Sequence, residues 1–274
     1  MQWHAFRAKA SMGERRKEKL YASMGLRAEQ EMRIRGLFPE ACSGDYPKRT
    51  PVKTREEVDE VAAKLRKRWR LGTDALESAT QCLENRGAVI VHVPDADLDE
   101  FDGLSATINH SLPMLIVNPC VAVDRLRFDL LHELGHVLMD TSGVKSKTEE
   151  EKLVHRFASS FLVPPETLKR ELGQKRKQLT LSEVLVLKEK YGLSVSAWIY
   201  SAHAHGVIAR AHYQQLFDEL EARDWRKTEP AVFEGNEKPA RLRQLALRAV
   251  SEGMLDSGTA VDILPDLEPE LKKE

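Results

Sequence analysis

Residues 127–140 read Arg-Phe-Asp-Leu-Leu-His-Glu-Leu-Gly-His-Val-Leu-Met-Asp, and the rest of the chain is best understood from this stretch. It contains an H-E-x-x-H pattern that runs from His132 to His136. Two histidines four positions apart lie about 40° apart around an α-helix, so both rings leave the same face. Apolar residues flank the pattern and predict a largely buried helix. Because unpartnered buried polar groups are costly, the pair of imidazoles favours a bound metal ion, with zinc as the natural occupant.

The same stretch supplies a candidate base, and the next segment supplies candidate ligands. Glu133 follows the first histidine and can reach a water molecule at the metal without binding the metal itself. Catalytic zinc usually has three protein ligands and an open position. The candidates for the third ligand begin the next predicted helix, and spacing alone does not choose among them: Glu149, Glu150, Glu151 and His155.

Composition and net charge restrict the classes of protein to which the chain can belong. The chain has 274 residues and a formal net charge of −1, so overall charge does not favour a nucleic acid or a membrane surface as partner. We find no apolar run near the roughly 20 residues that a membrane span needs, and no secretory signal. Three cysteines, an odd number, indicate no disulfide framework and favour a reducing cytoplasm.

The pattern along the chain predicts a mostly helical α+β fold in four parts. Strands are expected at 88–93, 104–110 and 114–118, and they form a small sheet packed on the H-E-x-x-H helix. Helices at 182–190 and 195–205, joined at Gly192, have the outline of a helix-turn-helix. The expected parts are a basic helical arm with linker at 1–48, a metal-binding core at 49–165, a helix-turn-helix-like subdomain at 166–230, and C-terminal helices with a tail at 231–274.

The first 36 residues carry nine lysines and arginines against four glutamates and are expected to be helical. One interpretation is an arm that contacts DNA or an acidic partner. The other is an amphipathic helix whose Leu20, Met24 and Leu26 pack on the main body. On either interpretation the arm is expected to be dispensable for metal binding.

Two motifs together resemble the ImmA/IrrE family of metallo-endopeptidases. The first is Arg127-Phe-Asp-Leu-Leu-His-Glu-Leu-Gly-His136, and the second is Glu151-Lys-Leu-Val-His-Arg-Phe-Ala-Ser-Ser-Phe-Leu-Val-Pro164. The family carries R-F-x-x-x-H-E-x-G-H followed by E-x-x-A-N-x-F-A-x-x-L-L-x-P. The resemblance implies a zincin-like core in which Glu151 is the third zinc ligand. It departs from the family at Val154 and His155, where alanine and asparagine are usual.

The implied activity is zinc-assisted peptide hydrolysis with Glu133 as general base. His155, His110 and Tyr200 are candidate donors to the developing oxyanion, and His155 is alternatively a residue that orients Glu151. Relatives of this type cleave helix-turn-helix repressors, so a repressor or antitoxin-like protein is the expected substrate. The alternative is a non-proteolytic regulator or antitoxin that binds a toxin or DNA, with zinc only structural. Oligomeric state stays open.

A further hypothesis concerns Cys120, which lies between the last predicted strand and the H-E-x-x-H helix. Thiolate is a strong zinc ligand. Cys120 is therefore a candidate inhibitory fourth ligand in a resting state, and the alternative is a small apolar residue packed beneath the helix.

Overall fold

The computed structural model describes residues 1–8, 12–41, 44–93, 101–109, 111–226 and 228–272. These residues group into two compact units, each assembled from segments that are distant in the sequence. The first unit comprises Met1–Tyr46, Thr80–Val117 and Lys238–Glu274, and the second comprises Pro47–Ala79 and Asn118–Glu237. The expected parts at 1–48, 49–165, 166–230 and 231–274 do not coincide with these units, because the two ends of the chain share a unit with the strands. The mostly helical α+β class is confirmed, with 56% helix and a small mixed sheet.

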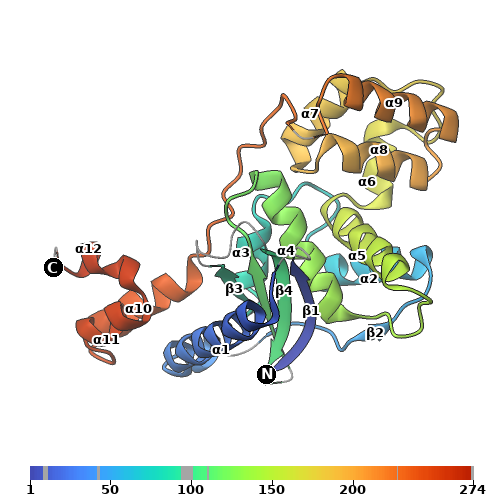
Figure 1. Ribbon diagram of the computed structural model, residues 1–274. Helices are drawn as coiled ribbons and strands as arrows, with labels where there is room; N and C mark the ends of the chain where they lie inside the picture. Colours follow the sequence, from blue (N-terminus) through green and yellow to red (C-terminus); the bar gives the residue numbers. More distant parts are fainter. Residues whose placement is uncertain (9–11, 42–43, 94–100, 110, 227, 273–274) are drawn as a thin grey trace. The chain divides into compact units, whose positions relative to one another are not determined.

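Within the described residues, the first unit contains a four-stranded sheet in the order β1-β4-β5-β3 (Figure 1). Strand β4 is antiparallel to both β1 and β5, whereas β3 runs parallel to β5. β-branched and other apolar side chains dominate the central strands, as is typical of buried strands. The strands are β1 (Gln2–Ala8), β3 (Val89–His92), β4 (Phe101–Ile108) and β5 (Leu112–Val117).

Strand β1 corrects the expectation that residues 1–36 are helical throughout. Its register shifts between Trp3 and Ala5, which is a bulge. Because of this shift, Trp3 and Phe6 both reach Tyr21, with ring centroids 4.8 and 5.2 Å apart, although three-residue spacing in a regular strand points side chains to opposite faces. Strand β1 is therefore an edge strand of the sheet, and its aromatic side chains pack against the helix that contains Tyr21.

Helix α1 (Glu14–Gly36) covers the sheet with one apolar face (Figure 1). Leu20, Met24 and Ala28 are buried in one cluster with side chains of β3, β4 and β5. This arrangement agrees with the interpretation of an amphipathic helix, with the exception of Leu26, which is 58% exposed. Further along α1, Ile34 packs into a second core with the C-terminal helices. These are α10 (Arg241–Ser251), α11 (Ser257–Ile263), the 3-10 turn η3 (Pro265–Leu267) and α12 (Glu268–Leu271).

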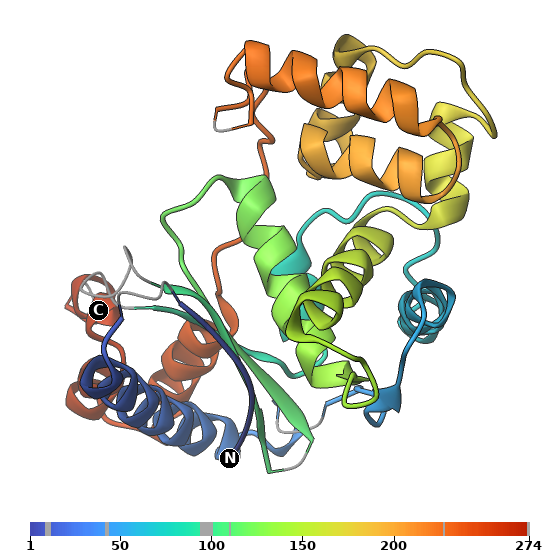
Figure 2. The same cartoon turned by 45° about the vertical axis from the view of Figure 1, so that its right-hand side comes forward.

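The second unit is helical apart from a short parallel pair, β2 (Thr50–Pro51) and β6 (Met139–Asp140). Three helices form its main layer, and Figure 2 shows α4 and α5 side by side. Helix α2 begins with a capping box in which Thr54 and Glu57 bond each other's backbone amides. The layer consists of α2 (Arg55–Arg68), α4 (Val123–Leu138) and α5 (Lys147–Leu162).

The predicted helix-turn-helix-like segment is a cluster of four helices within the described residues. Pro165 begins a helix that the sequence interpretation missed, because proline is favourable at a first helical position although it ends a preceding helix. The turn after α7 uses Gly192 in the left-handed region, with φ +60°. The helices are α6 (Pro165–Leu172), α7 (Leu181–Tyr191), α8 (Val195–Ala204) and α9 (Arg210–Ala222).

A buried charge cluster ties this segment to α4. The amine of Lys188 lies 3.1 Å from Asp124 in the first turn of α4 and 2.6 Å from Glu229. Burial opposes the charge on Lys188, but hydrogen bonds to Glu229 and Asp124 outweigh it and raise the pKa of the amine. Glu229 also accepts the Val195 amide at the start of α8.

The sequence also predicts a helix at about 74–85 that ends before Gly87. Only α3 (Ala79–Glu84) forms in the region of the expected helix. No helix in the described part of the chain combines the length and apolar character that crossing a membrane requires.

Candidate metal centre

Helix α4 carries the H-E-x-x-H residues on a buried face. His132 and Glu133 have no exposed surface, and His136 is 4% exposed. The helix ends where Met139 leaves it to form β6. Three polar side chains on one buried turn need partners, because burial without partners is unfavourable.

The next helix brings a carboxylate to the same place. Among the described residues, the ligand atoms of His132, His136 and Glu151 form a group in which every pair lies within 4.8 Å. The two Nε2 atoms are 3.1 Å apart. Oε2 of Glu151 lies 3.2 Å from Nε2 of His132, and Oε1 lies 3.7 Å from Nε2 of His136. The three predicted ligands therefore converge.

These distances fit a metal ion. Ligands about 2.0–2.1 Å from a tetrahedral centre lie about 3.3 Å from one another, close to the separations in this group. Two imidazoles and one carboxylate form a suitable donor set for a divalent transition metal that keeps an open position. The residues present thus fit the metal that the motif implies.

Local sequence explains how α5 reaches α4. Ser146 caps α5 by accepting the Glu149 amide at 3.2 Å, which sets the start of the helix. Glu151 follows within the next turn and is 26% exposed. The apolar side of α5, with Val154 and Phe157 fully buried, packs against α4. This packing directs Glu151 at the histidines and leaves the group open to solvent on the Glu151 side.

Glu150 has a position that the sequence interpretation did not anticipate. Its Oε1 lies 3.8 Å from Nδ1 of His136 and accepts a hydrogen bond from Thr141 at 2.8 Å. Nδ1 is the ring nitrogen that does not face the other ligands. A carboxylate behind a ligating imidazole orients the ring and raises its basicity. The sequence interpretation included Glu150 because it lies next to Glu151, but it treated Glu150 as a candidate metal ligand and not as a partner of His136.

The remaining predicted site residues do not all lie at the converging group. His155 is exposed, and its ring centroid lies 4.7 Å from that of His132. Tyr200 lies on α8, and His110 lies outside the described residues. Cys120 is exposed and is not a member of the converging group. Its amide donates a 2.8 Å hydrogen bond to the side chain of Asn118 in the turn before α4. This structure supports neither of the two interpretations of Cys120.

Arg127 supports the helix from the side. It has no exposed surface, donates to the Leu76 carbonyl at 2.8 Å, and lies 4.5 Å from the Phe233 ring centroid. Gly192 leaves room for it, since a Cβ there would lie 2.7 Å from an Arg127 guanidinium nitrogen. The arginine that begins the first motif is thus a packing element of α4.

Two histidines of one helix, a glutamate of the next helix and a buried glutamate beside the first histidine define a site of the metallopeptidase class. Residues 86–203 match the family model described as the IrrE N-terminal-like domain, Peptidase_M78. The match contains the whole converging group and confirms the resemblance drawn from the two motifs. No curated protein matches the chain.

Proposed function

We propose that the chain is a zinc-dependent endopeptidase that cleaves a partner regulatory protein, such as a helix-turn-helix transcriptional repressor. The convergence of His132, His136 and Glu151 beside Glu133 is the observation that carries the proposal. Two histidines and a glutamate are the ligand set of many catalytic zinc sites, which keep a fourth position for water or substrate. The family match supports peptide hydrolysis as the reaction class.

Zinc held by the three ligands supplies Lewis acidity, which lowers the pKa of water and polarises a carbonyl group. The chain's own residues supply proton transfer. In hydrolysis the water oxygen bonds to the carbonyl carbon, the C–N bond breaks, and the amine leaves with a proton. Glu133 is the base that removes the proton from water and returns it to the departing nitrogen.

His155 is the residue best placed to stabilise the oxyanion. Its ring lies next to that of His132, and the residue is exposed and therefore accessible to a substrate. An imidazole N–H directed at the developing negative charge stabilises the transition state more than the ground state. Its neighbour Phe128, at a centroid distance of 5.7 Å, limits the positions of the ring.

The partner class rests on the resemblance of the motifs. The alternative, a non-proteolytic regulator that binds DNA, has little support from helix α8, which would be the recognition helix of a helix-turn-helix. Helix α8 contains no lysine or arginine. Val195, Trp198 and Ile199 on this helix are buried. Specific recognition of DNA usually needs such donors on an accessible helix face.

The deciding experiment incubates the purified chain with the product of the adjacent gene, with and without a chelator. The expected result is a defined cut that zinc restores after chelation. Glu133→Gln should bind zinc and lose cleavage, because glutamine keeps the shape of the side chain without the base. Cleavage at the wild-type rate by Glu133→Gln would refute the assigned role of Glu133. An intact partner in every arm, together with salt-dependent DNA binding, would favour the alternative.

A further inference from the structure

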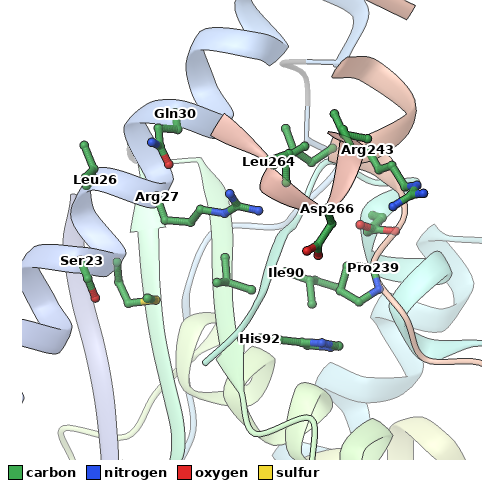
Figure 3. Close-up of a pocket in the computed structure, with 15 residues that line it drawn as sticks. Ser23, Leu26, Arg27, Gln30, Ile90, His92, Pro239, Arg243, Leu264 and Asp266 are labelled. Carbon is green, nitrogen blue, oxygen red and sulfur yellow. The ribbon is translucent and has the colours of Figure 1, made fainter. Parts of the chain in front are cut away.

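The first unit contains a pocket of about 480 Å³, far from the metal-binding residues in the sequence (Figure 3). Its walls come from α1, from β3, and from the C-terminal segment that begins at Pro239. The volume lies within the range of small-molecule sites. An occupant would contact both ends of the chain at once.

One part of the pocket is apolar. Met24 of α1, Ile90 of β3 and Leu264 beside η3 line it. Met24 and Ile90 are buried, whereas Leu264 is half-buried. Figure 3 shows Ile90 and Leu264 on the side of the pocket opposite α1. An apolar or aromatic group bound here would lose contact with water on several sides, which is the main source of affinity in such sites.

A second part carries hydrogen-bond donors from α1. Arg27 donates through Nη1 to the Ile263 carbonyl at 2.8 Å, and this bond holds the guanidinium at the pocket. Figure 3 shows the Arg27 side chain directed from α1 across the pocket. Gln30, one turn later on the same helix, adds a further donor, whereas Arg243 of α10 is already paired with Glu270. A guanidinium fork with donors remaining is well suited to carboxylate and phosphate oxygens.

His92 adds a polar atom at the end of β3. Its Nε2 is buried and has no hydrogen-bond partner among the described residues. Burial lowers the pKa of the ring, so the imidazole is neutral near pH 7. A neutral ring nitrogen without a partner at the wall of a pocket can exchange a hydrogen bond with a polar atom of a ligand.

The acidic residues of the pocket do not cancel these donors. Glu84 already accepts the amides of Ala240 and Arg241, both at 3.1 Å, and so caps the start of α10. Asp266 is exposed and lies across the pocket from Arg27. An anionic group is therefore expected on the Arg27 side.

We propose that this pocket binds a small organic anion, with an apolar or aromatic body against Met24, Ile90 and Leu264 and a carboxylate or phosphate on Arg27 and Gln30. The ligand joins α1 to the C-terminal segment and stabilises the first unit. This proposal is independent of the peptidase activity, since none of the residues involved belongs to the metal centre.

The test is a titration of the purified full chain, followed by the ¹⁵N resonances of its histidine rings, with His92 assigned from His92→Gln. Phenyl phosphate and phenylacetate are the two anionic probes, and inorganic phosphate and benzyl alcohol each supply one half of that chemistry. At least one anionic probe should shift the His92 resonances and bind at least tenfold more tightly than either half. The tighter of the two anions distinguishes a phosphate ligand from a carboxylate ligand.

Variants locate the binding. Arg27→Gln should weaken the tighter probe by about tenfold or more, because it removes a charge-assisted hydrogen bond. Gln30→Trp should fill the pocket and abolish binding while keeping the Arg27–Ile263 bond. Arg33→Gln, an exposed position of the same helix outside the pocket, is the matched control and should bind as wild type. No binding of either anion at about 10 mM would overturn the proposal, as would equal binding by all three variants or equal affinity for inorganic phosphate.

Discussion

Oε2 of Glu151 lies 3.2 Å from Nε2 of His132, although the two residues belong to different helices. Close packing of α4 on α5 makes this approach possible, and Gly135 is the reason that the helices come so close. A Cβ at Gly135 would lie 2.9 Å from Val154 Cγ1 and 3.1 Å from Phe157 Cδ1. The glycine inside the H-E-x-x-H motif therefore helps to bring the third ligand, Glu151, to the two histidines.

The first prediction concerns metal content. We expect about one zinc per chain, and His132→Ala and Glu151→Ala should each lower zinc affinity by at least tenfold. Glu149→Ala is the matched control, since Glu149 is exposed in the first turn of the same helix and outside the converging group. Elemental analysis and competition with a chromophoric chelator measure the affinities. Unchanged zinc in both ligand variants would place the site elsewhere.

Gly135→Ala tests the packing argument. Alanine is the better helix former by about 1 kcal/mol, but the added methyl group pushes on two fully buried side chains, and overpacking typically costs about 1–3 kcal/mol. We therefore expect a net loss of stability together with weaker zinc binding. Gly25→Ala, in α1 with nothing within 4 Å of the added Cβ, should instead gain about 0.5–1 kcal/mol. Urea denaturation measures the change in the free energy of unfolding for both variants. A stabilised Gly135→Ala would contradict the packing argument.

The sequence predicted the metal centre well because its signals are local. Two histidines at helical spacing and a glutamate at the start of the next helix depend on periodicity, which the chain displays directly. The resemblance selected Glu151, whereas spacing left Glu149, Glu150 and His155 open. The contact between Glu150 and His136 depends on how α5 rotates against α4, and no single-helix pattern contains that information.

The sequence predicted the architecture less well where contacts are distant. Residues 2–8 have no partner nearby in the sequence, and only pairing with β4 makes them a strand. The sequence interpretation of this segment as a helical arm depended on its charged residues and on the helix-forming residues after position 13. The grouping of both chain ends in one unit also depends on tertiary packing, through the core that Ile34 shares with the C-terminal helices. Local propensity is overridden in such places.

His155→Ala tests the proposed oxyanion donor. Loss of one such donor typically lowers kcat by about a hundredfold to a thousandfold, whereas zinc content should not change. His155→Asn should keep more activity than His155→Ala, because an amide also donates a hydrogen bond. Steady-state cleavage of the partner protein, with zinc measured in parallel, provides the comparison. Equal kcat in wild type and His155→Ala would leave the oxyanion to another group.

A pH dependence follows from His205 in the second unit. Its Nδ1 lies 3.9 Å from Asp59 and 3.5 Å from an Arg156 nitrogen. Burial and then the charge of Arg156 lower the pKa of the ring, with Asp59 opposing. The unfolded chain therefore binds the proton more tightly, and the free energy of unfolding falls as pH drops below about 6.5.

His205→Gln should remove this part of the pH dependence. The measurement is urea denaturation of metal-free wild type and variant at about pH 7.5, 6.5 and 5.5, so that loss of zinc at low pH does not contribute. The ligand histidines are present in both proteins and cancel in the comparison. The free energies of unfolding of the two proteins should differ less at about pH 5.5 than at about pH 7.5, because the contribution of neutral His205 is lost at the lower pH. Parallel curves across this range would assign the pH dependence to other groups.

The last prediction concerns the N-terminal segment, which the sequence alone presented as a dispensable arm. Arg35 is 1% exposed, and its guanidinium bonds Glu31 and the carbonyl oxygens of Ala41, Gly87 and Ala88. It thereby joins α1 to the segment that leads into β3. Arg35→Met leaves the Glu31 carboxylate buried without its cation, and breaking a buried pair in this way typically costs about 3–5 kcal/mol.

The double variant Glu31→Met with Arg35→Met separates the two causes of that loss. It removes the uncompensated charge, so it should be more stable than Arg35→Met alone, although the three backbone carbonyl groups still lose their donor. Lys64→Met is the control for an exposed pair with Glu60, where the change should stay within about 0.5 kcal/mol. Chemical denaturation measures all three. An Arg35→Met protein as stable as the Lys64→Met control would return residues 1–36 to the status of an appended arm, whereas the expected loss makes α1 part of the core of the first unit.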